Sequence, residues 1–161
     1  MESFSTTPTG ALETSEGIAI AQVSSPFSVK ETIDRFEKVL LAHDWTVMAR
    51  VDHGDNAKKE GIQATDARPY CTLRNLRDTE LIIFGVPKLG AQLMDAHASI
   101  ALDLPLKALA YADESGQTFF AYSYPYYYKW RHRLADSSDA VLEEFLGAQK
   151  GLVQEALMGD A

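Results

Sequence analysis

The spacing of apolar residues changes along the chain, and each change predicts a different element. Alternating or continuous apolar runs predict strands over residues 17–23, 45–52, 81–86, 106–112 and 117–124. Apolar residues at helical spacing predict helices that start near Ser28, at Pro87 and near Ser137. The last two strands are separated only by a turn at residues 113–116, so they are expected to form a hairpin.

The first helix has the clearest start signal. Ser28 and Glu31 have the spacing of a capping box, in which each side chain bonds the backbone amide of the other residue. One stripe of the helix is apolar, formed by Val29, Ile33, Phe36 and Leu40. In the strand that follows, alternation predicts one face with Trp45, Val47 and Val51 and the other with Thr46, Met48 and Arg50.

The order of these elements predicts an α+β fold. A strand–helix–strand opening followed by a hairpin favours a mixed sheet of about five strands, with helices packed mainly on one face. Residues 1–16 have no periodicity and are expected to form a disordered tail. The main domain is expected over residues 17–134. Residues 135–161 are expected to form an amphipathic helix that packs on this domain or at a dimer interface.

Composition narrows the functional classes. The net charge of −8 disfavours binding to nucleic acid or to anionic membranes. No apolar run approaches the roughly 20 residues of a membrane span, and the N-terminus lacks signal-peptide features, so a cytoplasmic protein is expected. The single cysteine, Cys71, excludes an internal disulfide and a multi-cysteine metal site. We expect no resident cofactor and no metal.

The first candidate site is the turn between the central strand and the helix after it. Gly85, Pro87, Lys88 and Gly90 lie where the free amides of a helix start meet a positive charge. This arrangement predicts a site for a small anionic ligand such as phosphate or a carboxylate. The alternative is that glycine and proline only make a tight connection and that Lys88 is solvated.

The second candidate site is catalytic. His53 follows Asp52 at a strand end, and either Asp52 or Asp103 could orient the imidazole for acid–base catalysis. The alternative is that Asp52 caps the next helix. His97 is expected in the core, and His132 is expected on the surface.

The third candidate is an interaction surface. Residues 122–133 are rich in tyrosine, tryptophan and arginine, which are frequent at protein interfaces. The segment therefore predicts a subunit contact, and we expect a homodimer. The sequence leaves three hypotheses open: a small-ligand-binding module, an enzyme that uses His53, and an interaction protein.

Five short motifs in a fixed order also resemble a known family. They are SVKET, the Asp52-His53 pair, AKKEG, LIIFGVPKLG and LDLPLKALAY. Together they are similar to domain-of-unknown-function family 302, over roughly residues 18–124. The resemblance implies a compact α+β domain of the TT1751-like fold, often dimeric, with no assigned activity.

The chain departs from that family in three places. Val86 stands where the family commonly has asparagine, the segment over residues 62–78 is longer, and the helix after Leu134 is expected to lie outside the family core. The longer segment and the extra helix could carry functions that the family does not share.

Overall fold

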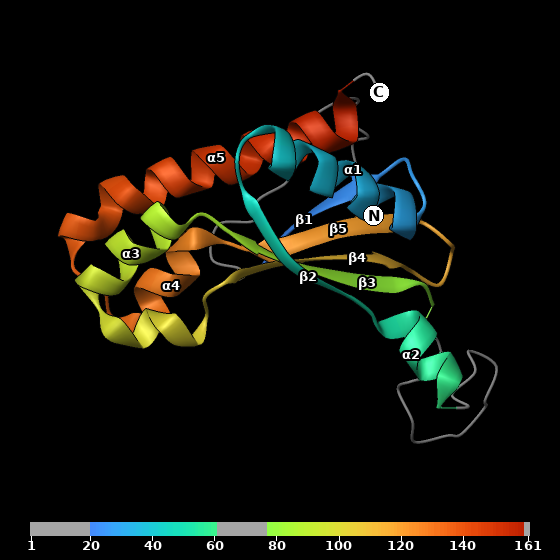
Figure 1. Ribbon diagram of the computed structural model, residues 1–161, viewed down its shortest axis with the longest axis horizontal. Coiled ribbons are helices and arrows are strands. Elements are labelled where there is room, and N and C mark those ends of the chain that lie inside the picture. The colour runs from blue at the N-terminus through green and yellow to red at the C-terminus, as the bar shows by residue number, and fades with distance from the viewer. Residues whose placement is uncertain (1–19, 61–76, 160–161) are drawn as a thin grey trace, which may run out of the picture.

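A five-stranded antiparallel sheet forms the centre of the molecule (Figure 1). The computed structural model describes residues 20–60 and 77–159. The strands are β1 Ile20–Ser25, β2 Thr46–Asp52, β3 Thr79–Gly85, β4 Leu106–Ala112 and β5 Thr118–Ser123, in the spatial order β1-β5-β4-β3-β2. The α+β class and the five strands are confirmed. The prediction of a mixed sheet is wrong, because every neighbouring pair is antiparallel. The first two strands lie at opposite edges of the sheet and never pair.

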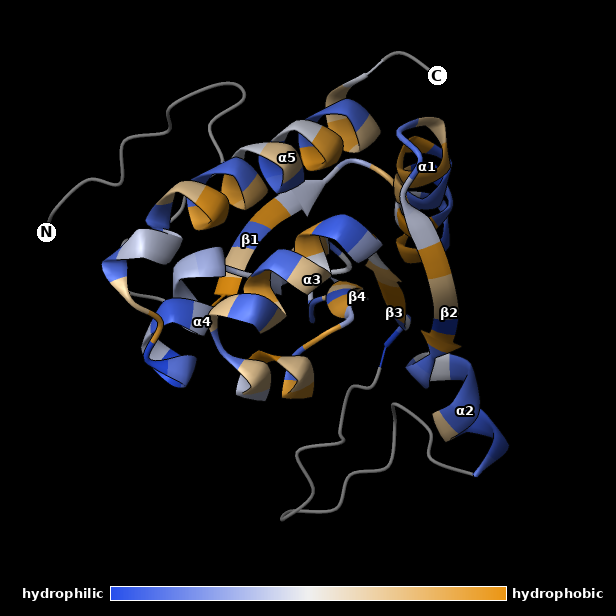
Figure 2. Ribbon diagram, turned by 60° about the vertical axis from the view of Figure 1, so that its left-hand side comes forward, coloured by the Kyte–Doolittle hydropathy of each residue, from blue (hydrophilic) through white to orange (hydrophobic). Residues whose placement is uncertain are grey.

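Two long helices cover one face of this sheet, as Figures 1 and 2 show. They are α1 Val29–Ala42 and α5 Asp139–Met158. The shorter helices α3 Pro87–Ala96 and α4 Pro125–His132 gather at the end where β3 terminates, and α2 His53–Lys59 lies at the opposite end (Figure 1). Two 3-10 segments, η2 Ala98–Leu102 and η3 Asp136–Ser138, connect these elements. No helix in the described ranges is both long enough and apolar enough to cross a membrane.

The start of α1 follows the predicted capping. Ser28 is the N-cap, and its hydroxyl accepts a hydrogen bond from the amide of Glu31 at 3.2 Å. The predicted stripe of Val29, Ile33, Phe36 and Leu40 is buried. The stripe packs on the sheet, where the Phe36 ring lies 5.2 Å from Phe84 and 4.8 Å from Phe120, centre to centre. This aromatic cluster joins α1 to β3 and β5.

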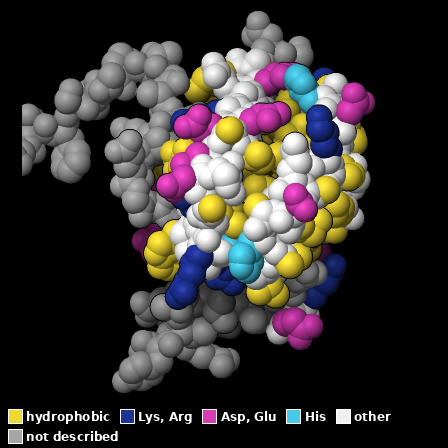
Figure 3. All heavy atoms as spheres, turned by 90° about the vertical axis from the view of Figure 1, so that its left-hand side faces the viewer, with side chains coloured by type: hydrophobic (Ala, Val, Ile, Leu, Met, Phe, Trp, Pro, Cys, Tyr) yellow, Lys and Arg dark blue, Asp and Glu magenta, His cyan; other side chains and the backbone are white. Residues whose placement is uncertain are grey.

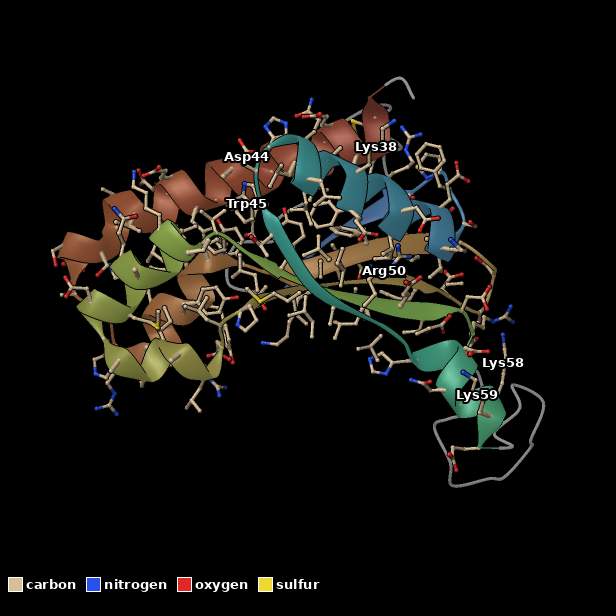
Figure 4. All side chains as sticks on the ribbon, viewed as in Figure 1. Lys38, Asp44, Trp45, Arg50, Lys58 and Lys59 are labelled. Atoms are coloured by element: carbon tan, nitrogen blue, oxygen red, sulfur yellow. The ribbon has the colours of Figure 1, made fainter. Side chains whose placement is uncertain are left out.

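A bulge in β2 changes the predicted alternation of that strand. The register with β3 shifts between Val47 and Ala49, so Met48 is the extra residue. Val47 stands opposite Phe84, whereas Val51 stands opposite Leu81, so these two valines point to different faces. Arg50 stands opposite the buried Ile82 and therefore points toward α1, as Figure 4 shows. The prediction that Val47 and Val51 share a face is wrong because of this bulge.

Arg50 is held by three carboxylates from two elements. Its guanidinium contacts Asp34 at 2.8 Å and Glu37 at 2.6 Å on α1, and Glu80 at 2.7 Å on β3. The hydrogen bond to Glu80 is the main cause that raises the pKa of Arg50 far above its usual range. This ion cluster fixes the edge strand β2 beneath α1.

The C-terminal helix packs on the rest of the domain. Leu142, Phe145, Leu152 and Val153 of α5 belong to the same buried core as α1 and the sheet. Arg35 of α1 donates hydrogen bonds to the last carbonyls of that helix, from Nε to Ala156 at 2.7 Å and from Nη2 to Gly159 at 2.6 Å. The expected tail over residues 1–16 and the long segment with Cys71 lie outside the described residues.

Candidate functional site

A pocket of about 300 Å³ lies beneath the turn from β3 into α3. All its lining residues are apolar or glycine: Met48, Gly85, Val86, Pro87, Leu89, Gly90, Leu93, Met94, Ala101, Leu104, Pro105, Leu106 and Phe145. They come from β2, β4 and α5 as well as from the turn itself and from η2. The structure thus places an apolar pocket where the sequence predicts an anion site.

The local sequence explains the space below the turn. β3 ends at Gly85, Val86 is the extended N-cap, and Pro87 begins the helix. A β-carbon on Gly90 would come no closer than 3.8 Å to the nearest atom outside the helix, the Cδ1 atom of Leu104. The two glycines of the turn therefore leave room that larger side chains would fill.

The four predicted ligand-binding residues divide into two groups. Gly85, Pro87 and Gly90 line the pocket, whereas Lys88 is exposed and lies outside the lining. No side chain caps the start of α3, so the first-turn amides lack an internal side-chain partner. A ligand in the pocket would meet hydrocarbon, with polar groups only at the helix start.

The predicted catalytic residues lie at two ends of the sheet. Asp52 caps α2, where Oδ1 accepts a hydrogen bond from the amide of Asp55 at 2.7 Å, and His53 is exposed at the start of that helix. Asp52 stands opposite Glu80 at the beginning of β3. Asp103 instead precedes β4, whose Leu106 stands opposite Phe84 near the end of β3. The predicted pairing of His53 with Asp103 is therefore wrong.

Asp103 has a different histidine partner. Its Oδ2 lies 2.6 Å from Nε2 of His132 and 2.8 Å from Nε of Arg131. Nδ1 of His132 lies 2.8 Å from the Ser99 hydroxyl, which also lies 2.9 Å from Nδ1 of His97. These residues form a polar cluster between η2 and α4.

Two of the sequence predictions for histidines are wrong. The side chain of His132 is only 3% exposed, although a surface position was predicted, and His97 is exposed, although a core position was predicted. His97 ends α3 and caps η2, so it lies beyond the apolar stripe of its helix. Pro125, Tyr128 and His132 are the buried residues of α4, spaced three and four apart. That spacing is the sequence signal for the buried histidine.

Burial and nearby groups raise the pKa of two residues beside this cluster, Tyr128 and Arg131. Burial raises the pKa of Tyr128 to about 12, and the nearby charge of Asp103 adds to the effect. The hydrogen bond to Tyr127 and the charge of Asp103 raise the pKa of Arg131. Tyr128 is therefore a neutral phenol and Arg131 a fixed cation across the physiological pH range.

The aromatic-basic segment over residues 122–133 does not form one continuous surface. Tyr122 is buried as part of β5, and Tyr128 and His132 are buried because residues 125–132 form α4. Trp130 is 78% exposed, and Leu102 is 76% exposed. Figure 3 shows apolar side chains gathered on this end of the molecule. The expected homodimer stays a prediction.

These features define an α+β domain in which two long helices cover one face of an antiparallel sheet and an apolar pocket lies at the β3–α3 turn. The chain belongs to the family described as domain of unknown function DUF302, which matches residues 21–151. The match includes residues 139–151 of α5, so the prediction that the helix after Leu134 lies outside the family core is wrong.

Two kinds of known protein resemble this chain. A structure titled "Crystal structure of uncharacterized conserved protein DUF302 from Bacillus stearothermophilus" aligns with a TM-score of 0.63 and 16% identity, covering 88% of this chain and 97% of that one. This similarity concerns the fold alone.

Proteins named "Fluoride-specific ion channel FluC 1" from Brucella suis and "Fluoride-specific ion channel FluC 2" from Brucella melitensis are each 36% identical to this chain over 141 residues, or 88% of this chain. The match covers 50% of the first relative and 47% of the second. The chain therefore spans about half the length of these relatives.

Proposed function

We propose that this domain binds a small, mainly apolar ligand in the pocket beneath the β3–α3 turn. The observation that carries the proposal is the lining, which consists of apolar residues and glycines from six elements and has no charged side chain. The pocket volume of about 300 Å³ lies at the lower end of the range for ligand pockets. Each methylene group that enters such a pocket contributes roughly 0.8 kcal/mol, so a short hydrocarbon chain is the fitting class of ligand.

An anionic head group would fit at one place on the rim. The start of α3 carries amides without a side-chain cap and the positive end of the helix dipole. Lys88 stands in the first turn of that helix and is exposed, so it can reach an anion in solvent. The combination of hydrocarbon below and positive charge above favours a short-chain carboxylate.

A second candidate ligand comes from the relatives named as fluoride-specific ion channels, which share this domain over about half their length. A domain of this kind could serve a channel as an attached module that senses the ion. The start of α3 is where an anion would be held. Because transfer of a small ion from water to an apolar site is costly, the lining favours the carboxylate over fluoride.

The thermal-shift response to octanol, octanoate and fluoride separates these ligands. We expect octanol and octanoate to raise the melting temperature, octanoate the more, and fluoride at the same concentration to leave it unchanged. Lys88→Ala should reduce the octanoate shift to that of octanol and leave the octanol shift unaltered. If neither organic ligand changes the melting temperature, the apolar-ligand proposal fails. A shift with fluoride that Lys88→Ala removes would favour the channel-module proposal.

A further inference from the structure

We propose that Ser99 is the nucleophile of an acyl-transfer site, with His132 as its general base and Asp103 as the carboxylate that orients the imidazole. This activity is separate from ligand binding in the apolar pocket, and Ser99 is not among the residues that line that pocket. The substrate class is a small carboxylic ester.

The three side chains meet the geometric requirements of a serine–histidine–carboxylate site. The Ser99 hydroxyl lies 2.8 Å from Nδ1 of His132, and the opposite ring nitrogen of His132 lies 2.6 Å from Oδ2 of Asp103. Both distances fall within hydrogen-bond reach for a nucleophile and its base and for a base and its orienting group. The residues come from η2, α4 and the junction before β4, so the fold and not the sequence spacing brings them together.

The partners of the imidazole match the tautomer that catalysis needs. Asp103 Oδ2 lies 2.6 Å from Nε2 of His132 and is also held at 2.8 Å by Nε of the permanently charged Arg131. A neutral ring with its proton on Nε2 donates to Asp103 and leaves Nδ1 free to accept the proton of the Ser99 hydroxyl.

The surroundings hold this imidazole in one orientation. The His132 side chain is 3% exposed, whereas Ser99 is half-buried. Arg131 is tied in turn to the Tyr127 hydroxyl at 2.8 Å. A base locked by its neighbours beside a half-buried serine hydroxyl is the arrangement that nucleophilic catalysis uses.

His97 is a poorer base for the same hydroxyl. Its Nδ1 lies 2.9 Å from the Ser99 hydroxyl and also accepts the Ser99 amide at 3.3 Å. The ring is exposed, and its polar contacts among the described residues are all with Ser99, whose single hydroxyl proton goes to His132, so no carboxylate there orients His97. His132 is therefore the base that the geometry favours.

The reaction balances without a cofactor. The Ser99 oxygen attacks the ester carbonyl carbon while its proton passes to Nδ1 of His132. The tetrahedral intermediate collapses, the carbon–oxygen bond to the alcohol breaks, and the leaving oxygen takes the proton from His132. Water then adds to the acyl-serine with the same base and releases the carboxylic acid. The net reaction is ester plus water to acid plus alcohol.

Covalent labelling with a small fluorophosphonate tests the proposal, with peptide mass spectrometry to locate the adduct. We expect the folded wild-type chain to be labelled at Ser99 and Ser99→Ala to remove the adduct. Asp103→Asn should slow labelling by about a hundredfold, because it weakens the base without removing the nucleophile. Ser115→Ala is the matched control, since this exposed serine bonds to a carboxylate at 2.7 Å, and it should label at the wild-type rate, as should His97→Ala.

Circular dichroism confirms that each variant is folded before labelling. A folded wild-type chain that gains no adduct at Ser99 would overturn the proposal. So would a folded Asp103→Asn variant that reacts at the wild-type rate, because the cluster would then only tie η2 to α4. If Asp103→Asn does not fold, the rates of wild type and His97→Ala decide: loss of labelling in His97→Ala would assign the base to His97 and contradict the proposal.

Discussion

Phe120→Ala should lower the free energy of unfolding by about 3–5 kcal/mol. The Phe120 ring is fully buried and lies 4.8 Å from Phe36 in the aromatic cluster between α1 and the sheet. Its removal leaves a cavity in the core that α1, β3 and β5 share, and the surrounding backbone can close it only in part. Since domains of this size are stable by roughly 5–15 kcal/mol, this loss is a large share of the total. Urea unfolding followed by circular dichroism measures it.

The neighbouring residue supplies a matched control. Phe119 precedes Phe120 on β5 and points to the other face of the sheet, where it is partly exposed and stacks on Tyr111 at 5.7 Å. The same change there, Phe119→Ala, should cost only about 1 kcal/mol. Equal losses at the two positions would contradict a sheet whose core lies on one face.

Arg50→Met should lower the free energy of unfolding by about 3 kcal/mol at neutral pH. The arginine side chain is 25% exposed and Glu80 only 10%, so the variant leaves carboxylates close together without their counter-charge. Lys58→Met is the control, because that lysine is 61% exposed and lies 3.4 Å from Asp78. This surface pair should contribute less than about 1 kcal/mol.

The effect of Arg50→Met should also depend on pH. Lys30, followed by Arg50, lowers the pKa of Asp34 in the folded state. The resulting stabilisation is fully present above the unfolded value of about 4 and disappears as the pH falls through the lower folded value. The stability difference between wild type and Arg50→Met should therefore shrink when unfolding is measured at acidic pH. A difference that stays constant between neutral and acidic pH would show that Arg50 acts through packing and not through its charge.

The periodicity of apolar residues in the sequence was sufficient to predict the helix and strands that form the core. The apolar stripe and the Ser28 cap located α1, and the continuous apolar run located β3. The pairing directions could not follow from these patterns, because the edge positions of β1 and β2 depend on contacts between distant segments. The bulge at Met48 could not be predicted either. An extra residue in a strand reverses which face the following side chains point to, and it leaves no mark in the composition.

The sequence marked the turn beside the pocket but not the rest of the pocket lining. Gly85 and Pro87 marked a strand-to-helix turn, and the pocket lies beneath it. The contribution of Leu104 and Phe145 to the pocket lining could not be predicted, because neither residue is near the turn in sequence.

The contact between Asp103 and His132 could not be predicted either, because these residues are also far apart in sequence. The run of tyrosine and basic residues in α4 has no clear apolar stripe, so its helical spacing, and with it the burial of His132, was overlooked.

The proposed binding site is the pocket beneath the β3–α3 turn. Isothermal titration of octanoate into Gly90→Leu and Gly147→Leu tests it most directly. Both variants place the same side chain on a helix. At Gly90 it would enter the pocket, whereas a β-carbon on Gly147 would meet no atom within 4 Å and that glycine lies outside the lining. We predict that Gly90→Leu abolishes octanoate binding and that Gly147→Leu binds as the wild type does. Unchanged binding by a folded Gly90→Leu variant would contradict the claim.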